Sequence, residues 1–117
     1  MTITMVEDTI FHKIVRKEVS SDIVYEDEEV LVFKDINPKA PTHLLFIAKK
    51  EEDFVSSIID LTEETAHVPL MLIRKAQKFA KEKGIDGYKL TFHVGEGGGQ
   101  VVFYLHLHLM SQTTIDS

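Results

Sequence analysis

Near the end of this 117-residue chain, residues 101–110 read VVFYLHLHLM. The run is apolar except for Tyr104 and two histidines, His106 and His108, which stand one residue apart. Side chains alternate between the two faces of a strand, so both imidazoles are predicted to lie on the same face, roughly 7 Å apart along it. One face would carry Val102, Tyr104, His106, His108 and Met110, and the other, predicted to be core, Val101, Phe103, Leu105, Leu107 and Leu109.

A glycine-rich loop precedes this strand. Residues 95–100 read GEGGGQ, and backbone N–H groups of such a loop can surround a phosphate. A plain hairpin turn is the structural alternative for the same composition. Because the loop leads into the histidine strand, we expect a bound phosphate and the imidazoles to meet.

Two histidines beside an anion site suit two kinds of chemistry. A neutral imidazole can attack phosphorus and form a phosphoryl- or nucleotidyl-histidine, while a second imidazole supplies charge or a proton. Zinc is the competing use, with His43, His93 or Asp35 as a third ligand, although the spacing fixes none of these. Two half-exposed histidines without chemistry are the third alternative. The glycine loop favours the phosphate site.

Composition limits the partners. The length and 44% hydrophobic content predict one domain over residues 1–117, and the net charge of −6 argues against a broad surface for nucleic acid or an anionic membrane. The absence of cysteine excludes disulfides and thiolate zinc sites. The N-terminal MTITMVED predicts neither a signal peptide nor a membrane span, so we expect a soluble cytoplasmic protein.

The remaining segments predict an α+β fold. Asp8 is expected to cap a short helix within residues 9–18, and a hairpin is predicted over residues 23–36 around an acidic turn. Residues 43–49 predict a third strand.

A long helix follows, and two strands complete the domain. The helix is expected to run from a Thr62 cap to a stop at Gly84, with a bend or a broken first turn at Pro69. Strands are predicted over residues 88–94 and 101–110. The order favours an antiparallel sheet of about five strands, covered on one face by the long helix.

Four blocks of the chain carry a family resemblance. They read DTIFHKIVRKE, IVYEDEEVLVFKDINPKAPTHLLFI, GYKLTFHVGEGGGQ and YLHLHLM. In content, order and interval they resemble the histidine-triad (HIT) superfamily, and specifically its Hint-type branch of purine-nucleotide-binding phosphoramidases. The resemblance implies a homodimer without a cofactor. It also implies cleavage of a nucleoside 5′-phosphoramidate or related phosphoanhydride through a nucleotidyl-histidine.

Roles follow by position from the family motif, in which histidines and hydrophobic residues alternate. Tyr104, His106 and His108 match its three histidine positions, so the resemblance implies that His106 attacks phosphorus and His108 supports the phosphate. His43 matches a further histidine near the nucleophile. The expected nucleotide contacts are Ile10, Phe11, Phe33, Asp35, Ile36, Gly99, Gln100 and Val101, with Asp35 on the ribose. Ordinary core positions for the four apolar residues at 10, 11, 33 and 36, and a loop-capping role for the acid, are equal alternatives.

The sequence departs from the family at several positions. Tyr104 replaces a histidine whose backbone carbonyl orients the nucleophile, so that hydrogen bond can persist. His93 replaces an asparagine that contacts phosphate or ribose, and Val101 replaces a serine near the leaving group. We expect these three to lie on or beside one pocket. The zinc site of some bacterial relatives falls on Thr9, His12, Glu51 and Tyr104, and is predicted to be absent.

Four functions therefore stand open. A hydrolase acting through His106 is the first, and a nucleotide-binding module without the chemistry is the second. The third is a rebuilt pocket in which His93, Tyr104, His106 and His108 act on a different small molecule. Metal binding by His106 and His108 is the fourth.

Overall fold

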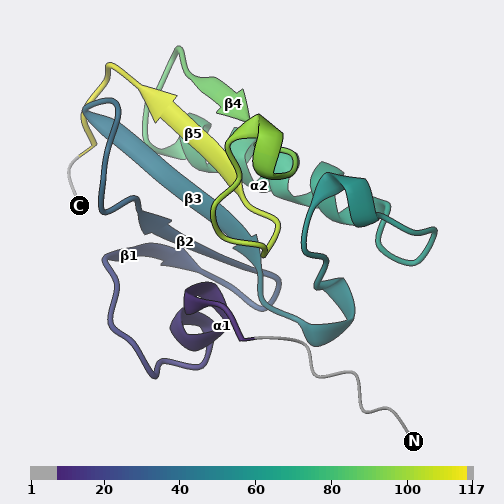
Figure 1. Ribbon diagram of the computed structural model, residues 1–117. Helices are drawn as coiled ribbons and strands as arrows, with labels where there is room; N and C mark the ends of the chain where they lie inside the picture. Colours follow the sequence, from purple (N-terminus) through teal and green to yellow (C-terminus); the bar gives the residue numbers. More distant parts are fainter. Residues whose placement is uncertain (1–7, 116–117) are drawn as a thin grey trace, which may run out of the picture.

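The structure, a computed structural model, describes residues 8–115, which form one antiparallel five-stranded sheet with two α-helices (Figure 1). This confirms the predicted α+β class. The strand order is β1-β2-β3-β5-β4, so β5 lies one strand in from the β4 edge. The strands are β1 (Ile23–Glu26), β2 (Val30–Lys34), β3 (Thr42–Ala48), β4 (Lys89–Thr91) and β5 (Leu107–Ser111). The helices are α1 (Ile10–Val15) and α2 (His67–Glu82), with 3-10 turns η1 (Glu51–Asp53), η2 (Ile58–Asp60) and η3 (Glu96–Gly98).

Both faces of the central strands are buried. Alternate residues of β2 and β3 pack with α2 on one face, where Leu72 and Phe46 belong to the larger core cluster. The intervening residues pack with Phe11 and Ile14 of α1 on the other face. Strands covered on both faces read as continuous apolar runs, which explains the sequence of these segments. None of the helices within residues 8–115 is long and apolar enough to cross a membrane.

The N-terminus of α1 is capped by Thr9, so the prediction that Asp8 is the cap is wrong. The Thr9 hydroxyl accepts from the backbone N–H groups of Phe11 and His12, and the Thr9 N–H donates to Nδ1 of His12 at 2.9 Å. This is a capping box with histidine in the place of glutamate. Asp8 instead pairs with Arg16 at the exposed surface.

The long helix starts later than predicted. It begins at His67 rather than at a Thr62 cap, and residues 63–66 are turns. Pro69 is therefore the third helical residue. Its missing N–H would have had no partner inside the helix, so the expected disruption takes the form of a late start rather than a kink.

The last two strands are shorter than predicted. Residues 101–106 leave the sheet, and the Leu105 N–H donates to the carbonyl of Val55 at 2.9 Å instead of a strand neighbour. Val101 is 86% exposed and Phe103 is also exposed, so the prediction that both belong to the core is wrong. The leucines from 105 onward are buried as expected.

Gly84 ends α2, as predicted, with φ of +71°. The Ile85 N–H donates to the Ala80 carbonyl at 2.8 Å and the Gly84 N–H to Lys81 at 3.3 Å, which is a Schellman motif. Glycine is favoured there because other residues resist the left-handed conformation.

We expect Gly84→Ala to lower the free energy of unfolding by about 1 kcal/mol, since alanine is strained at positive φ. Denaturant unfolding of both variants measures the difference. Gly87→Ala is the matched control, because a Cβ there meets nothing within 4 Å and φ is not left-handed. Equal stability of the two variants would contradict the assignment.

Candidate active site

Four imidazoles gather on the α1 side of the sheet, around His108 of β5. Ring centroids lie 4.3 Å away for His93, 4.9 Å for His106 and 5.2 Å for His43. The sheet register explains the meeting, since His108 pairs with Leu45 of β3 on one side and with β4 on the other. All four predicted histidines therefore belong to one cluster.

His106 is held as a neutral imidazole of one tautomer. Its Nδ1 lies 2.7 Å from the Tyr104 carbonyl oxygen, and because a carbonyl only accepts, Nδ1 carries the proton. The lone pair is therefore on Nε2. Burial lowers the pKa of His106, which keeps the ring uncharged at neutral pH. The edge-to-face ring of Phe11, with centroids 5.0 Å apart, forms part of that burial.

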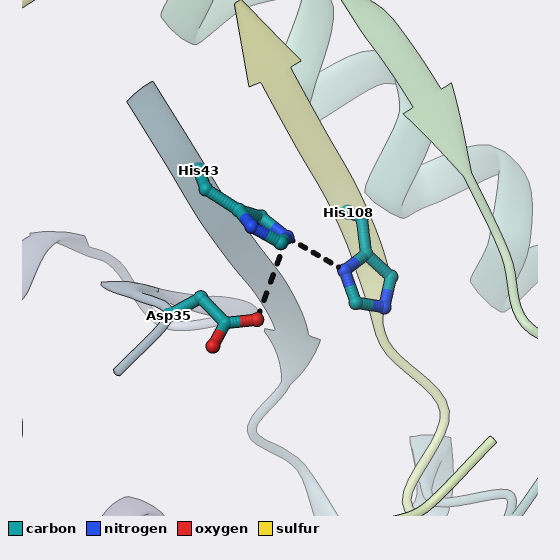
Figure 2. Close-up of side chains that lie close together, drawn as sticks. All are labelled: Asp35, His43 and His108. Atoms are coloured by element: carbon teal, nitrogen blue, oxygen red, sulfur yellow. Dashed lines mark hydrogen bonds and ion pairs between the residues drawn. The ribbon is translucent and has the colours of Figure 1, made fainter. Parts of the chain in front are cut away.

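A chain of hydrogen bonds fixes the tautomers of His43 and His108. The Lys39 N–H donates to Nδ1 of His43 at 3.0 Å, so the His43 proton is on Nε2. That Nε2–H donates to Nδ1 of His108 at 2.9 Å, and Oδ2 of Asp35 lies 3.4 Å from the same nitrogen (Figure 2). His108 consequently carries its proton on Nε2.

The Nε2–H of His108 is a buried donor without a hydrogen-bond partner among the described residues. An unsatisfied buried donor costs about 1–3 kcal/mol, so such groups in folded proteins need an explanation. A ligand acceptor supplies one. An anion bound beside His106 would accept a hydrogen bond from this N–H.

Burial keeps three of the imidazoles neutral. It lowers the pKa of His108 to about 4, with repulsion from neighbouring imidazoles adding to the effect. The pKa of His43 is lowered for the same reason, although the carboxylate of Asp35 opposes the shift. The cluster around His106 therefore carries little positive charge of its own at neutral pH.

Asp35, His43 and His108 each bring one potential ligand atom within 4.8 Å of the others, as in a metal site. The hydrogen bonds do not fit a metal ion. Metal-bound histidines normally donate their second ring N–H, whereas Nδ1 of His43 accepts from Lys39. Coordination through Nε2 would leave that ring with no proton. The donor set fits a proton chain better than a metal centre.

Asp35 has the loop-capping role that the sequence allowed. Its Oδ1 accepts from the Asn37 N–H at 2.8 Å and so stabilises the turn after β2. Its Oδ2 faces His43.

The glycine loop is a closed turn, contrary to the expected phosphate cradle. The N–H groups of Gly98 and Gly99 donate to the carbonyls of Gly95 and Glu96 at 3.1 and 3.0 Å. Gln100 is only 3% exposed, and its side-chain oxygen accepts from the Gly95 N–H. Its amide nitrogen donates to the carbonyls of residues 56 and 102, so the Gln100 side chain positions the loop instead of facing a ligand.

The three departures from the family do not share one pocket, so that prediction is wrong. Tyr104 is 4% exposed, its ring packs on His12 and Phe54, and its hydroxyl donates to the Ala48 carbonyl. Burial raises the pKa of Tyr104 to about 12. Val101 lines a separate hollow of about 550 Å³. Only His93 joins the imidazoles.

The four apolar residues expected around the base divide into two pairs. Phe11 and Phe33 are buried with ring centroids 5.3 Å apart, and Phe11 also contacts His106. Ile10 is exposed, and Ile36 is 90% exposed, so these two present apolar surface to solvent. Lys39 was missed from the sequence, because its contribution is a backbone N–H that no side-chain pattern signals.

The chain is similar to known proteins over most of its length. The family model described as "Scavenger mRNA decapping enzyme C-term binding" matches residues 8–116. A purine nucleoside phosphoramidase of Escherichia coli strain K12 is 42% identical over 108 residues, which cover 91% of this chain and 88% of that protein.

Solved structures are similar over almost the whole chain. A HIT family hydrolase from Legionella pneumophila Philadelphia 1 has a TM-score of 0.82 at 38% identity, covering 92% of this chain and 95% of that one. A histidine triad protein from Clostridium difficile has a TM-score of 0.83 at 36% identity, covering 97% and 98%. With the four matched blocks and the antiparallel sheet, these relatives show that the chain belongs to the histidine-triad superfamily.

Proposed function

We propose that the protein is a hydrolase that cleaves a nucleoside 5′-phosphoramidate, or a related phosphoanhydride, through a nucleotidyl intermediate on His106. The observation that carries the proposal is the hydrogen bond from Nδ1 of His106 to the Tyr104 carbonyl. It leaves an unprotonated Nε2 on a neutral ring, which is the form of imidazole that attacks phosphorus.

The reaction has two steps in this proposal. Nε2 of His106 attacks the α-phosphorus, a bond forms between them, and the bond to the leaving amine breaks as the amine takes up a proton from solvent. Water then attacks the same phosphorus and loses a proton to solvent, the bond from phosphorus to Nε2 breaks, and the nucleoside monophosphate and the neutral imidazole are released. Splitting one displacement into two is the usual advantage of a covalent intermediate.

His108 is the phosphate donor in this scheme. Its buried Nε2–H has no partner among the described residues and can donate to a non-bridging oxygen. The His43 ring holds that donor in place through the 2.9 Å hydrogen bond to Nδ1. A donor fixed before the reaction stabilises developing charge without reorganising.

We further propose that the substrate carries a purine nucleoside. A relative 42% identical to the chain is named a purine nucleoside phosphoramidase, and this supports the assignment. Phe11 beside His106 and the exposed Ile36 offer apolar contact for a base. Asp35, partly exposed at the end of β2, offers a carboxylate to the ribose hydroxyls.

We also propose that the protein is a homodimer. β4 pairs only with β5 among the described strands, so one edge of the sheet is open. Leu70 and Ile73 expose apolar surface on α2. An open edge and exposed leucine together suit pairing with a second copy.

Release of amine from adenosine 5′-phosphoramidate tests the hydrolase. We expect His106→Ala to lower kcat/KM at least about a thousandfold, since it removes the nucleophile. His67→Ala is the matched control, because His67 lies at the start of α2 and pairs with Asp53 outside the cluster. No turnover in the parent protein would contradict the proposal, and AMP binding without turnover would select the nucleotide-binding module.

The pH profile gives a second test. Because burial lowers the pKa of His106, the acid limb of kcat/KM should lie below the ordinary imidazole value of about 6.5. Phe11→Ala exposes the ring and should move this limb to higher pH. Ile14→Ala, a buried change on the same helix, should leave it in place. An acid limb at or above 6.5 in the parent protein would refute the neutral-nucleophile assignment.

Light scattering after size exclusion tests the dimer. We expect twice the molar mass of one chain at micromolar concentration, and the mass of one chain for Leu70→Glu, which places a charge on the exposed apolar surface of α2. A parent protein that elutes with the mass of a single chain would rule out the dimer.

A further inference from the structure

The imidazoles and loop amides described at the proposed phosphate site supply little positive charge, although the Lys39 ammonium acts electrostatically on His43. His43, His106 and His108 are all kept neutral by burial. The amides of Gly98 and Gly99 are engaged inside the closed loop. A phosphoryl group carries negative charge that grows as the nucleophile attacks, so one neutral donor at His108 leaves most of that charge uncompensated.

His93 is the remaining imidazole, and it differs from the other three. It is half-buried rather than buried, and its ring lies nearly parallel to His108, at 31° with centroids 4.3 Å apart. No hydrogen bond or ion pair described for residues 8–115 engages either of its ring nitrogens. Both nitrogens are thus available to an anion and to a proton.

The backbone places His93 between the imidazole cluster and the glycine loop. It follows β4 two residues beyond Thr91, which pairs with His108. A Cβ built on Gly99 would lie 4.0 Å from Nδ1 of His93, so the loop passes beside this ring. An anion that accepts from His108 at this place would also reach His93.

We propose that His93 is the cationic ligand of the substrate phosphate, and that it takes up a proton when the phosphate binds. This proposal rests on the proposed function, which identifies the ligand as the phosphate of a nucleotide. No covalent step involves His93, which supplies one charged N–H donor to a non-bridging oxygen. An imidazolium beside an anion is stabilised relative to the neutral ring, so binding and proton uptake are linked.

The charged and titratable groups of this cluster come from several elements. His106 and His108 come from β5 and the residue before it, and His43 comes from β3; all three are neutral. Asp35 and Lys39 come from the segment between β2 and β3, and Glu96 lies on the glycine loop. A phosphate bound beside His93 favours a proton on its ring.

Calorimetry with adenosine 5′-methylphosphate tests the proposal. This phosphodiester keeps a single negative charge between pH 5 and 9, so any proton taken up on binding enters the protein. Heats measured in buffers of different ionisation enthalpy give the number of protons. We expect an uptake approaching one proton near neutral pH, and an affinity that falls at least about fivefold from pH 6 to pH 8.

Three variants complete the test. His93→Asn should bind with almost no proton uptake and a nearly flat pH dependence, and His93→Gln should reproduce it. His67→Asn, which removes a histidine outside the cluster, should retain the parent behaviour. Binding by the parent protein without proton uptake, or uptake that persists in both His93 variants, would overturn the assignment.

The outcome separates this proposal from the proposed function. Proton-linked binding without hydrolysis of the phosphoramidate would retain the role of His93 and remove the hydrolase. Hydrolysis that depends on His106, in a protein that does not bind the methylphosphate, would retain the hydrolase and remove the role of His93.

Discussion

The site depends on one hydrogen bond, from Nδ1 of His106 to the backbone carbonyl of Tyr104. A carbonyl can only accept, so this contact fixes which nitrogen holds the proton and which one faces the reacting group. The carbonyl is held in turn by a segment anchored at both ends. Gln100 ties one end to the glycine loop, and the Leu105 N–H ties the other to Val55. The tautomer of the proposed nucleophile is thus a consequence of backbone packing.

The same arrangement explains why tyrosine is tolerated at position 104. The interaction with His106 uses the backbone, so the side chain is free to serve the core. The Tyr104 ring fills the space between His12 and Phe54, and its hydroxyl satisfies the Ala48 carbonyl at the end of β3. Tyrosine at this position of the histidine motif therefore alters packing under α1 and leaves the His106 imidazole oriented.

Sequence patterns predicted the sheet better than the loops. Alternating and continuous apolar runs correctly predicted strands β1 to β3 and the burial of the leucines from 105 onward. These patterns depend only on residues close together in the sequence. The start of β5 was misplaced because residues 101–106 are as apolar as a strand. What takes them out of the sheet is a hydrogen bond to Val55 and the side chain of Gln100, both contacts between distant segments. The histidines of the site were also predicted from the sequence. The pairing of His43 with His108, 65 residues apart, followed only from the sheet register.

The four imidazoles show how burial and exposure divide roles among identical side chains. A nucleophile must be neutral to attack, whereas a phosphate ligand works best when it is charged, and a single environment cannot serve both. Phe11 and the Tyr104 carbonyl hold His106 in the first state, while the half-buried position of His93 beside the glycine loop suits the second. Of the three departures from the family, Tyr104 belongs to the core and Val101 to an exposed hollow. Of the three, only His93 lies against the imidazole cluster, where its ring centroid is 4.3 Å from that of His108.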